Sequence, residues 1–252
     1  LWKLCIYIGV PLYTAGLIWY SARMTIIPQY DLNEVQAEAL RLAAGGTGAW
    51  SSYFMTFPHQ IPVTLILAAA YRLGMAVGIN DFYMTGNAAN ALALGLSALG
   101  TLLLAGRLMQ KPAAITVFLF FVCNPIWFLY VSWTSTDTFC IPFALWGLYF
   151  LIKSEEKGYR PAFLAAGFGL LFVSMGIRAV NIVLVIAWFL HLCFRENRRN
   201  IAKAALMAAL IYAGLTAAYR GVCSAVEAPY DSEARFPVSH WVMMGLNRDT
   251  AG

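Results

Sequence analysis

A few ionisable side chains in the polar stretches of this chain could do chemistry, and Asp31 comes first among them. A carboxylate at the mouth of a cavity can act as a general base and take a proton from an acceptor hydroxyl. Leu32, Val35 and Ala39 recur at helical spacing after it, so Asp31 can equally be a helix N-cap, with Glu34 three positions on as in a capping box. Both interpretations stay open, and Glu34 is a candidate substrate contact.

A second polar pair precedes a long apolar stretch. Phe57 and Pro58 lead into His59 and Gln60, and the apolar residues begin directly afterwards. Aromatic residues are common where helices meet the membrane surface. His59 and Gln60 are therefore either the hydrated end of a helix or contacts to a substrate.

Two further charged residues stand alone between apolar stretches. Asp137 follows Thr136, and a lone acid there needs water, a partner or a substrate, unless it caps the next helix. Arg178 can extend to lipid headgroups, or its planar fork can hold the phosphate of a bound lipid. Both are candidate substrate-binding residues.

The remaining histidines differ in setting. His240, beside Trp241 in a polar stretch, could bind an anion or orient an acceptor, whereas His191 lies among apolar residues and is interpreted as a packing residue. No nucleotide-binding or HExxH pattern occurs, and no CxxC pair. The five cysteines are interpreted as small core residues. Without a nucleotide-binding motif, the activated substrate should arrive in the membrane if the protein is an enzyme.

Composition indicates which elements position these residues. Hydrophobic residues make up 61% of the 252 residues and charged residues 12%, against about 45–50% and about 25% in soluble domains. A bilayer must solvate so much apolar surface, and helices pair their own backbone groups there. The net charge of +5 does not indicate nucleic-acid binding, because the basic residues lie between apolar segments.

Basic loops predict the topology of this all-α, polytopic transmembrane bundle. Three basic loops, at 107–111, 153–160 and 195–203, should be cytoplasmic. Lys3 places the N-terminus on the same side, so the loop 23–60 after the first helix should be outside. The loop 23–60 and the basic loop 107–111 then lie on opposite faces, so only one of the two segments between them, 61–79 or 84–106, can cross the membrane. Arg72 at the centre of 61–79 would be costly in the bilayer, so this segment should lie at the interface or re-enter. The apolar segments are 4–22, 61–79, 84–106, 113–130, 138–152, 161–177, 179–194 and 203–219.

About seven spanning helices result, with surface helices in the first outer loop; the alternative is that one basic loop breaks the rule. The chain is expected to be one domain, and a fragment lacking both ends. Its expected parts are a first helix at 1–22, the outer loop 23–60, the bundle 61–219, and 220–252 as the start of a second outer segment.

Four stretches of this sequence resemble the GT-C superfamily of polytopic glycosyltransferases, in particular its bacterial protein O-mannosyltransferase-like branch. They are Asp31 with the amphipathic residues after it, Phe57–Gln60, Thr136–Asp137 opening a helix, and Ser239–Asn247, which includes His240. The resemblance covers most of the chain, and Ser239–Asn247 is its most specific stretch.

This resemblance implies a seven-helix module that uses a polyprenyl-phosphate-linked sugar donor on the outer face of the bacterial plasma membrane. The acceptor would be an envelope polymer, a lipid or a protein. Asp31 matches the catalytic acid and Asp137 a second acidic position, while Arg178 is a looser match to residues that hold the lipid phosphate. The stretch Asp31–Asn33 lacks a paired acid, so no metal ligand is assigned, although a divalent metal stays possible.

Two functions without chemistry remain as alternatives. A transporter or lipid flippase would suit the prolines inside apolar segments, such as Pro11, Pro125 and Pro142, because broken helices often line a transport path. Against it, no internal repeat relates the two halves. The third possibility is a structural membrane subunit.

Overall fold

The computed structural model describes residues 1–24, 26, 29–230 and 233–234, and every regular element in these ranges is a helix. The α-helices are α1 (Trp2–Leu4), α2 (Val10–Ser21), α3 (Asp31–Ala43), α4 (Ser52–Thr56), α5 (Ile61–Ala76), α6 (Phe82–Leu108), α7 (Lys111–Val122), α8 (Ile126–Tyr130), α9 (Thr136–Glu156), α10 (Pro161–Ile177), α11 (Ile182–Arg195) and α12 (Arg198–Ala225). A π-helical turn (Cys5–Gly9) joins α1 to α2, and 3₁₀ turns precede α5 (Pro58–Gln60) and α11 (Ala179–Asn181).

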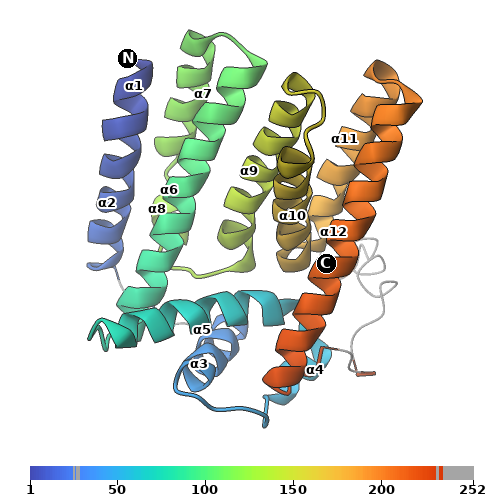
Figure 1. Ribbon diagram of the computed structural model, residues 1–252. Helices are drawn as coiled ribbons and strands as arrows, with labels where there is room; N and C mark the ends of the chain where they lie inside the picture. Colours follow the sequence, from blue (N-terminus) through green and yellow to red (C-terminus); the bar gives the residue numbers. More distant parts are fainter. Residues whose placement is uncertain (25, 27–28, 231–232, 235–252) are drawn as a thin grey trace, which may run out of the picture.

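The helices form an upright bundle with a crosswise layer at one end. Helices α2, α6, α7 and α9–α12 run side by side, while α3 and α5 lie across their lower ends (Figure 1). We call this the α5 end. Segment 61–79, which was expected to lie at the interface or to re-enter, forms α5. This helix runs across the bundle rather than along it (Figure 1), and Arg72 on it is exposed.

Three of the described helices are long and apolar enough to cross a membrane: Trp2–Ser21, Phe82–Leu108 and Arg198–Ala225. Helix α7 has only 12 residues and α10 has 17. The segment expected as one helix over 113–130 is two, a correction to the prediction. Pro125 lies at the break, where its ring excludes a continuous helix and the Asn124 side chain accepts a bond from the Ile126 amide at 3.1 Å.

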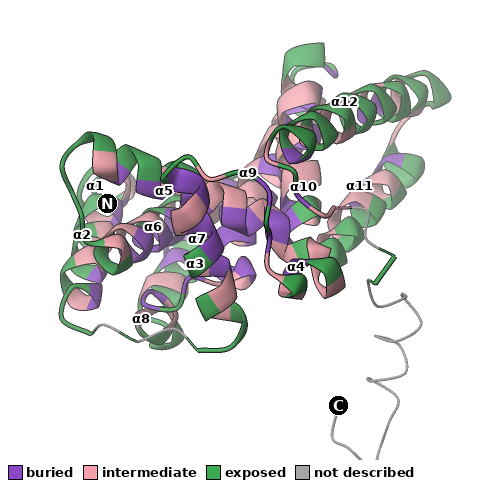
Figure 2. Ribbon diagram, turned by 90° about the horizontal axis from the view of Figure 1, so that it is seen from below, coloured by how far each residue is buried: buried purple, intermediate pink, exposed green. Residues whose placement is uncertain are grey.

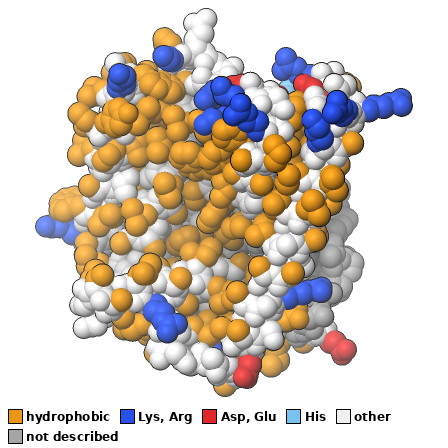
Figure 3. All heavy atoms as spheres, viewed as in Figure 1, with side chains coloured by type: hydrophobic (Ala, Val, Ile, Leu, Met, Phe, Trp, Pro, Cys, Tyr) orange, Lys and Arg blue, Asp and Glu red, His pale blue; other side chains and the backbone are white. Residues whose placement is uncertain are grey.

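The three basic loops lie at one end of the bundle, which we call the basic end. They join α6 to α7, α9 to α10 and α11 to α12, all opposite α3 and α5 (Figure 1). Most Lys and Arg side chains visible in Figure 3 gather there, while hydrophobic side chains cover the flanks. The predicted grouping of the loops on one side is therefore present.

Burial is uneven across the bundle. Helix α6 is the most enclosed of the three long helices, whereas α12 lies at the edge with much of its surface exposed (Figure 2). Cys5, Cys140 and Cys223 are buried, but Cys123 and Cys193 are exposed. The prediction that all five cysteines are core residues is thus wrong for two, because their helices present apolar flanks outward rather than to a protein core.

Helices α9 and α10 pack with their backbones close together. A Cβ at Gly147 would lie 2.7 Å from Leu171 Cγ, and one at Gly167 would lie 2.6 Å from Leu151 Cδ2. Small residues allow such close approach between helices in membranes. This contact fixes the ends of both helices, which carry two of the candidate site residues.

Candidate functional site

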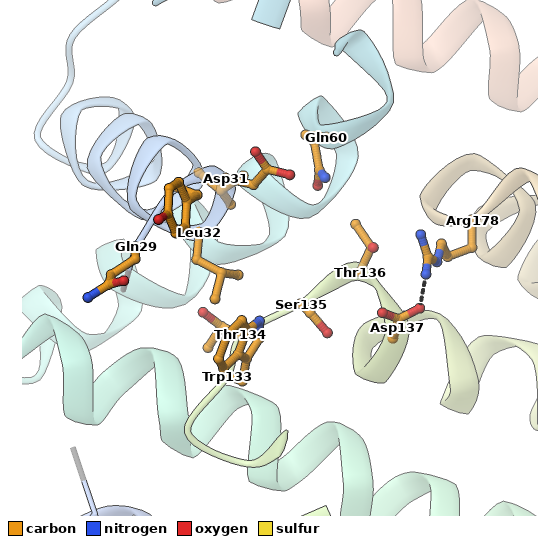
Figure 4. Close-up of a pocket in the computed structure, with 12 residues that line it drawn as sticks. Gln29, Asp31, Leu32, Gln60, Trp133, Thr134, Ser135, Thr136, Asp137 and Arg178 are labelled. Carbon is orange, nitrogen blue, oxygen red and sulfur yellow. Dashed lines mark hydrogen bonds and ion pairs between the residues drawn. The ribbon is translucent and has the colours of Figure 1, made fainter. Parts of the chain in front are cut away.

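A pocket of about 270 Å³ opens at the α5 end (Figure 4). It is lined by residues 29–32 and 35, by Gln60, by residues 133–137 and by Arg178. These residues come from the start of α3, the turn before α5, the loop before α9 and the end of α10. Four sequence candidates, Asp31, Gln60, Asp137 and Arg178, therefore meet around one space.

Asp31 is the first residue of α3 and an exposed one. Tyr30 takes the N-cap position with φ of 52°, and no side-chain cap bond forms. The interpretation of Asp31 as an N-cap in a capping box with Glu34 is therefore corrected. The carboxylate instead sits in the first helical turn, where the unpaired backbone N–H groups favour negative charge. Asp31 lines the pocket (Figure 4).

Asp137 and Arg178 form an ion pair on the far side of the pocket (Figure 4). Their side chains are 46% and 42% exposed, so water and ligands can reach both. Ser135, not Asp137, holds the N-cap position of α9, and it makes no side-chain cap bond. A cap role for Asp137 is thus excluded, and Arg178 is directed to this carboxylate.

A small polar cluster anchors the ion pair between helices. Ser174 Oγ of α10 donates to the Cys140 carbonyl of α9 at 2.9 Å, and Asn181 Nδ2 donates to the same Ser174 Oγ at 2.7 Å. The backbone N–H of Arg178 donates to the Ser174 carbonyl at 2.8 Å. These bonds fix the start of α9 and the end of α10 relative to each other.

The loop between α8 and α9 forms one wall of the pocket, and two amide side chains hold it. Gln36 Nε2 of α3 donates to Thr134 Oγ1 at 2.6 Å. Asn90 Nδ2 of α6 donates to backbone carbonyls of the loop. Sequence reasoning missed both residues, although an Asn in the middle of an apolar segment was an available signal.

Tyr53 and His59 lie near Asp31 and belong to a group of aromatic residues whose rings contact one another: Tyr53, Phe54, Phe57 and His59. Burial, and next the Asp31 carboxylate, raise the pKa of the Tyr53 hydroxyl. The His59 residue is exposed and lies close to both Arg178 and Asp31. Partial burial of its ring and then the Arg178 charge lower its pKa, while Asp31 opposes them. His59 is accordingly neutral at pH 7, and it lies beside the pocket rather than in its lining.

Three other predicted residues have different outcomes. Glu34 is not among the lining residues, and His240 lies outside the described residues. His191 Nε2 contacts Glu155 Oε2 at 3.2 Å near the basic end, so it belongs to a polar contact between α9 and α11 rather than to apolar packing alone. In the described part of the chain, no cluster of three His, Cys, Asp or Glu residues could hold a metal ion.

Comparison of the chain with protein-family models, with curated proteins and with solved structures found no match in any of the three.

The pocket combines groups with complementary chemistry. Asp31 supplies a carboxylate without an ion-pair partner among the described residues. Across the pocket, Arg178 supplies a planar fork that suits phosphate or carboxylate oxygens. The site can therefore bind a polar ligand between a proton acceptor and an anion-binding group.

Proposed function

We propose that this protein is a membrane glycosyltransferase that moves a sugar from a polyprenyl-phosphate donor to an acceptor hydroxyl. In this proposal the chain crosses the membrane seven times. The basic end faces the cytoplasm, as positively charged loops do, and the pocket at the α5 end opens on the outer face of a bacterial plasma membrane.

The convergence of Asp31, Gln60, Asp137 and Arg178 on one pocket carries the proposal. These residues are far apart in sequence and belong to different elements, so their convergence depends on how the whole chain folds. An open pocket beside the membrane surface suits a donor whose lipid tail stays in the bilayer while its phosphate and sugar reach water.

The reaction would be a single displacement at the anomeric carbon. Asp31 accepts the proton of the acceptor hydroxyl, whose oxygen forms the new bond to that carbon. The bond from the carbon to the phosphate oxygen breaks, its electron pair leaves with the phosphate, and the configuration inverts. Arg178 would neutralise the departing phosphate, so positioning and electrostatics supply most of the rate.

The test is the release of polyprenyl phosphate from a polyprenyl-phosphate sugar, with the purified protein in liposomes and a panel of hydroxyl acceptors. Asp31→Asn keeps the shape of the side chain and removes the base. We expect its rate to fall by about 10²–10⁴-fold, with unchanged yield and thermal stability.

Asp81→Asn is the matched control, since Asp81 is an exposed aspartate outside the pocket lining. It caps α6 by accepting the Met84 amide at 2.9 Å, and Asn preserves that bond. Full activity in Asp31→Asn would remove the mechanism. Movement of intact donor between leaflets, without release of polyprenyl phosphate, would instead identify a flippase.

A further inference from the structure

One buried side chain outside the pocket controls the position of its wall. Asn90 lies on α6 and is fully buried. Its Nδ2 lies 2.7 Å from the carbonyl oxygen of Tyr130, 3.0 Å from that of Val131 and 3.2 Å from that of Trp133. Two N–H bonds are thus shared among three acceptors of one short loop.

The orientation of the Asn90 amide is settled by its surroundings. Oδ1 is buried without a hydrogen-bond partner among the described residues. If the amide were flipped, Oδ1 would face three carbonyl oxygens, which only accept hydrogen bonds. Burying the unpaired Oδ1 costs free energy. The hydrogen bonds from Nδ2 to the loop offset that cost.

The loop that Asn90 holds leads directly into the pocket. Trp133 and Thr134 line the pocket, and Asp137 follows in the first turn of α9. Gln36 holds the same loop from the α3 side. The far wall is therefore fastened to α6, the most enclosed of the long helices, and cannot shift without breaking these bonds.

We propose that Asn90 is a positioning residue: its amide holds the 130–135 loop so that Trp133 and Asp137 stand at a fixed distance from Asp31 across the pocket. This inference rests on the proposed function for its catalytic consequence. Its structural part concerns only the loop and can be measured without any turnover.

The test compares Asn90→Leu, which fills the volume but cannot donate, with Asn90→Ala, which removes both the volume and the donor. Two quantities are measured: hydrogen exchange of the amides of residues 131–135, and kcat and KM for release of polyprenyl phosphate. Ser97→Ala is the matched control, because Ser97 is equally buried on α6 but donates only to its own helix at Ala93, at 2.8 Å.

In Asn90→Leu we expect exchange in the loop to quicken on the order of tenfold. We expect kcat to fall by roughly 10- to 100-fold, since small misplacements of reacting groups are costly, and KM to change less. Asn90→Ala should show a defect similar to that of Asn90→Leu, because both variants lack the donor. A role in packing alone predicts a defect in Asn90→Ala and near-wild-type behaviour in Asn90→Leu, because only Ala leaves a large void.

Three results would overturn the inference: unchanged loop exchange in Asn90→Leu, near-wild-type activity in Asn90→Leu beside a defect in Asn90→Ala, or an equal defect in Ser97→Ala. If the wild-type protein releases no polyprenyl phosphate, the proposed function fails. The exchange rates still decide whether Asn90 holds the wall.

Discussion

At the scale of single residues, the ion pair between Asp137 and Arg178 defines what the far side of the pocket can bind. Both side chains are close to half exposed, and exposed ion pairs contribute only about 0.2–1 kcal/mol to stability. The proposed function accordingly uses Arg178 as a ligand contact rather than as a structural bond. An anionic group entering the pocket can take over some of its donors from Asp137.

Arg178→Lys separates these two roles. Lys keeps the positive charge but loses the planar fork. Losing one charge-assisted hydrogen bond, worth about 1.5–3 kcal/mol, should raise the KM for the donor about tenfold or more. Thermal stability should be nearly unchanged. Donor-concentration dependence of polyprenyl phosphate release measures this effect.

The matched control is Arg72→Lys, since Arg72 is exposed on α5 and outside the pocket lining. Its KM should equal that of the wild type. A stability loss in Arg178→Lys without a change in KM would assign Arg178 to the fold instead of the ligand.

At the scale of elements, the close packing of α9 and α10 holds the two members of that ion pair. Asp137 lies at the start of α9 and Arg178 directly follows α10. The glycine contacts between the helices leave no room for a side chain. The geometry of the site therefore depends on residues well away from the pocket.

Gly167→Val should push the two helices apart. Its Cβ would lie 2.6 Å from Leu151 Cδ2 and 3.1 Å from the Gly147 carbonyl oxygen. Overpacking of this kind costs about 1–3 kcal/mol, so thermal unfolding in detergent should begin at lower temperature, with reduced activity.

Gly169→Val provides the comparison on the same helix. A Cβ there meets only Ile211 Cγ2, at 4.0 Å, so this variant should unfold near the wild-type temperature. Equal destabilisation by both substitutions would mean that valine in the helix, rather than the contact with α9, is the cause.

At the scale of the whole molecule, charge divides the two ends of the bundle. The basic loops occupy one end, and the crosswise helices with the pocket occupy the other (Figures 1 and 3). Such asymmetry orients a protein in the membrane. The proposed outward-facing pocket depends on this orientation.

Cysteine labelling in intact cells tests the orientation. Thr47 lies between α3 and α4, and Lys157 lies between α9 and α10; both are exposed. A membrane-impermeant thiol reagent should label Thr47→Cys directly and Lys157→Cys only after permeabilisation. The wild-type chain, with its five cysteines, gives the background. Labelling of both positions from outside would contradict the proposed topology.

Composition and local spacing alone determined the helical class, the basic loops and the polar residues worth testing. Helix formation depends mainly on residues close together in the sequence, so α3 and α6 could be predicted from the residues within each helix. Because one arginine makes crossing the bilayer expensive, segment 61–79 was expected to lie at the interface or to re-enter, and α5 does lie across the bundle (Figure 1). The break at Pro125 was considered only for the transport alternative and did not change the predicted helix bounds, since apolar periodicity alone does not register a missing N–H.

Only the tertiary structure decided which polar residues meet. Gln36 and Thr134 are 98 positions apart and Asp137 and Arg178 are 41 apart, and no local pattern specifies such pairs. Likewise, Tyr30 rather than Asp31 takes the cap position of α3, and Asn90 turns its amide toward a loop that α6 meets only in the folded chain. Burial and packing of whole helices settle these contacts, because each depends on where several elements lie at once.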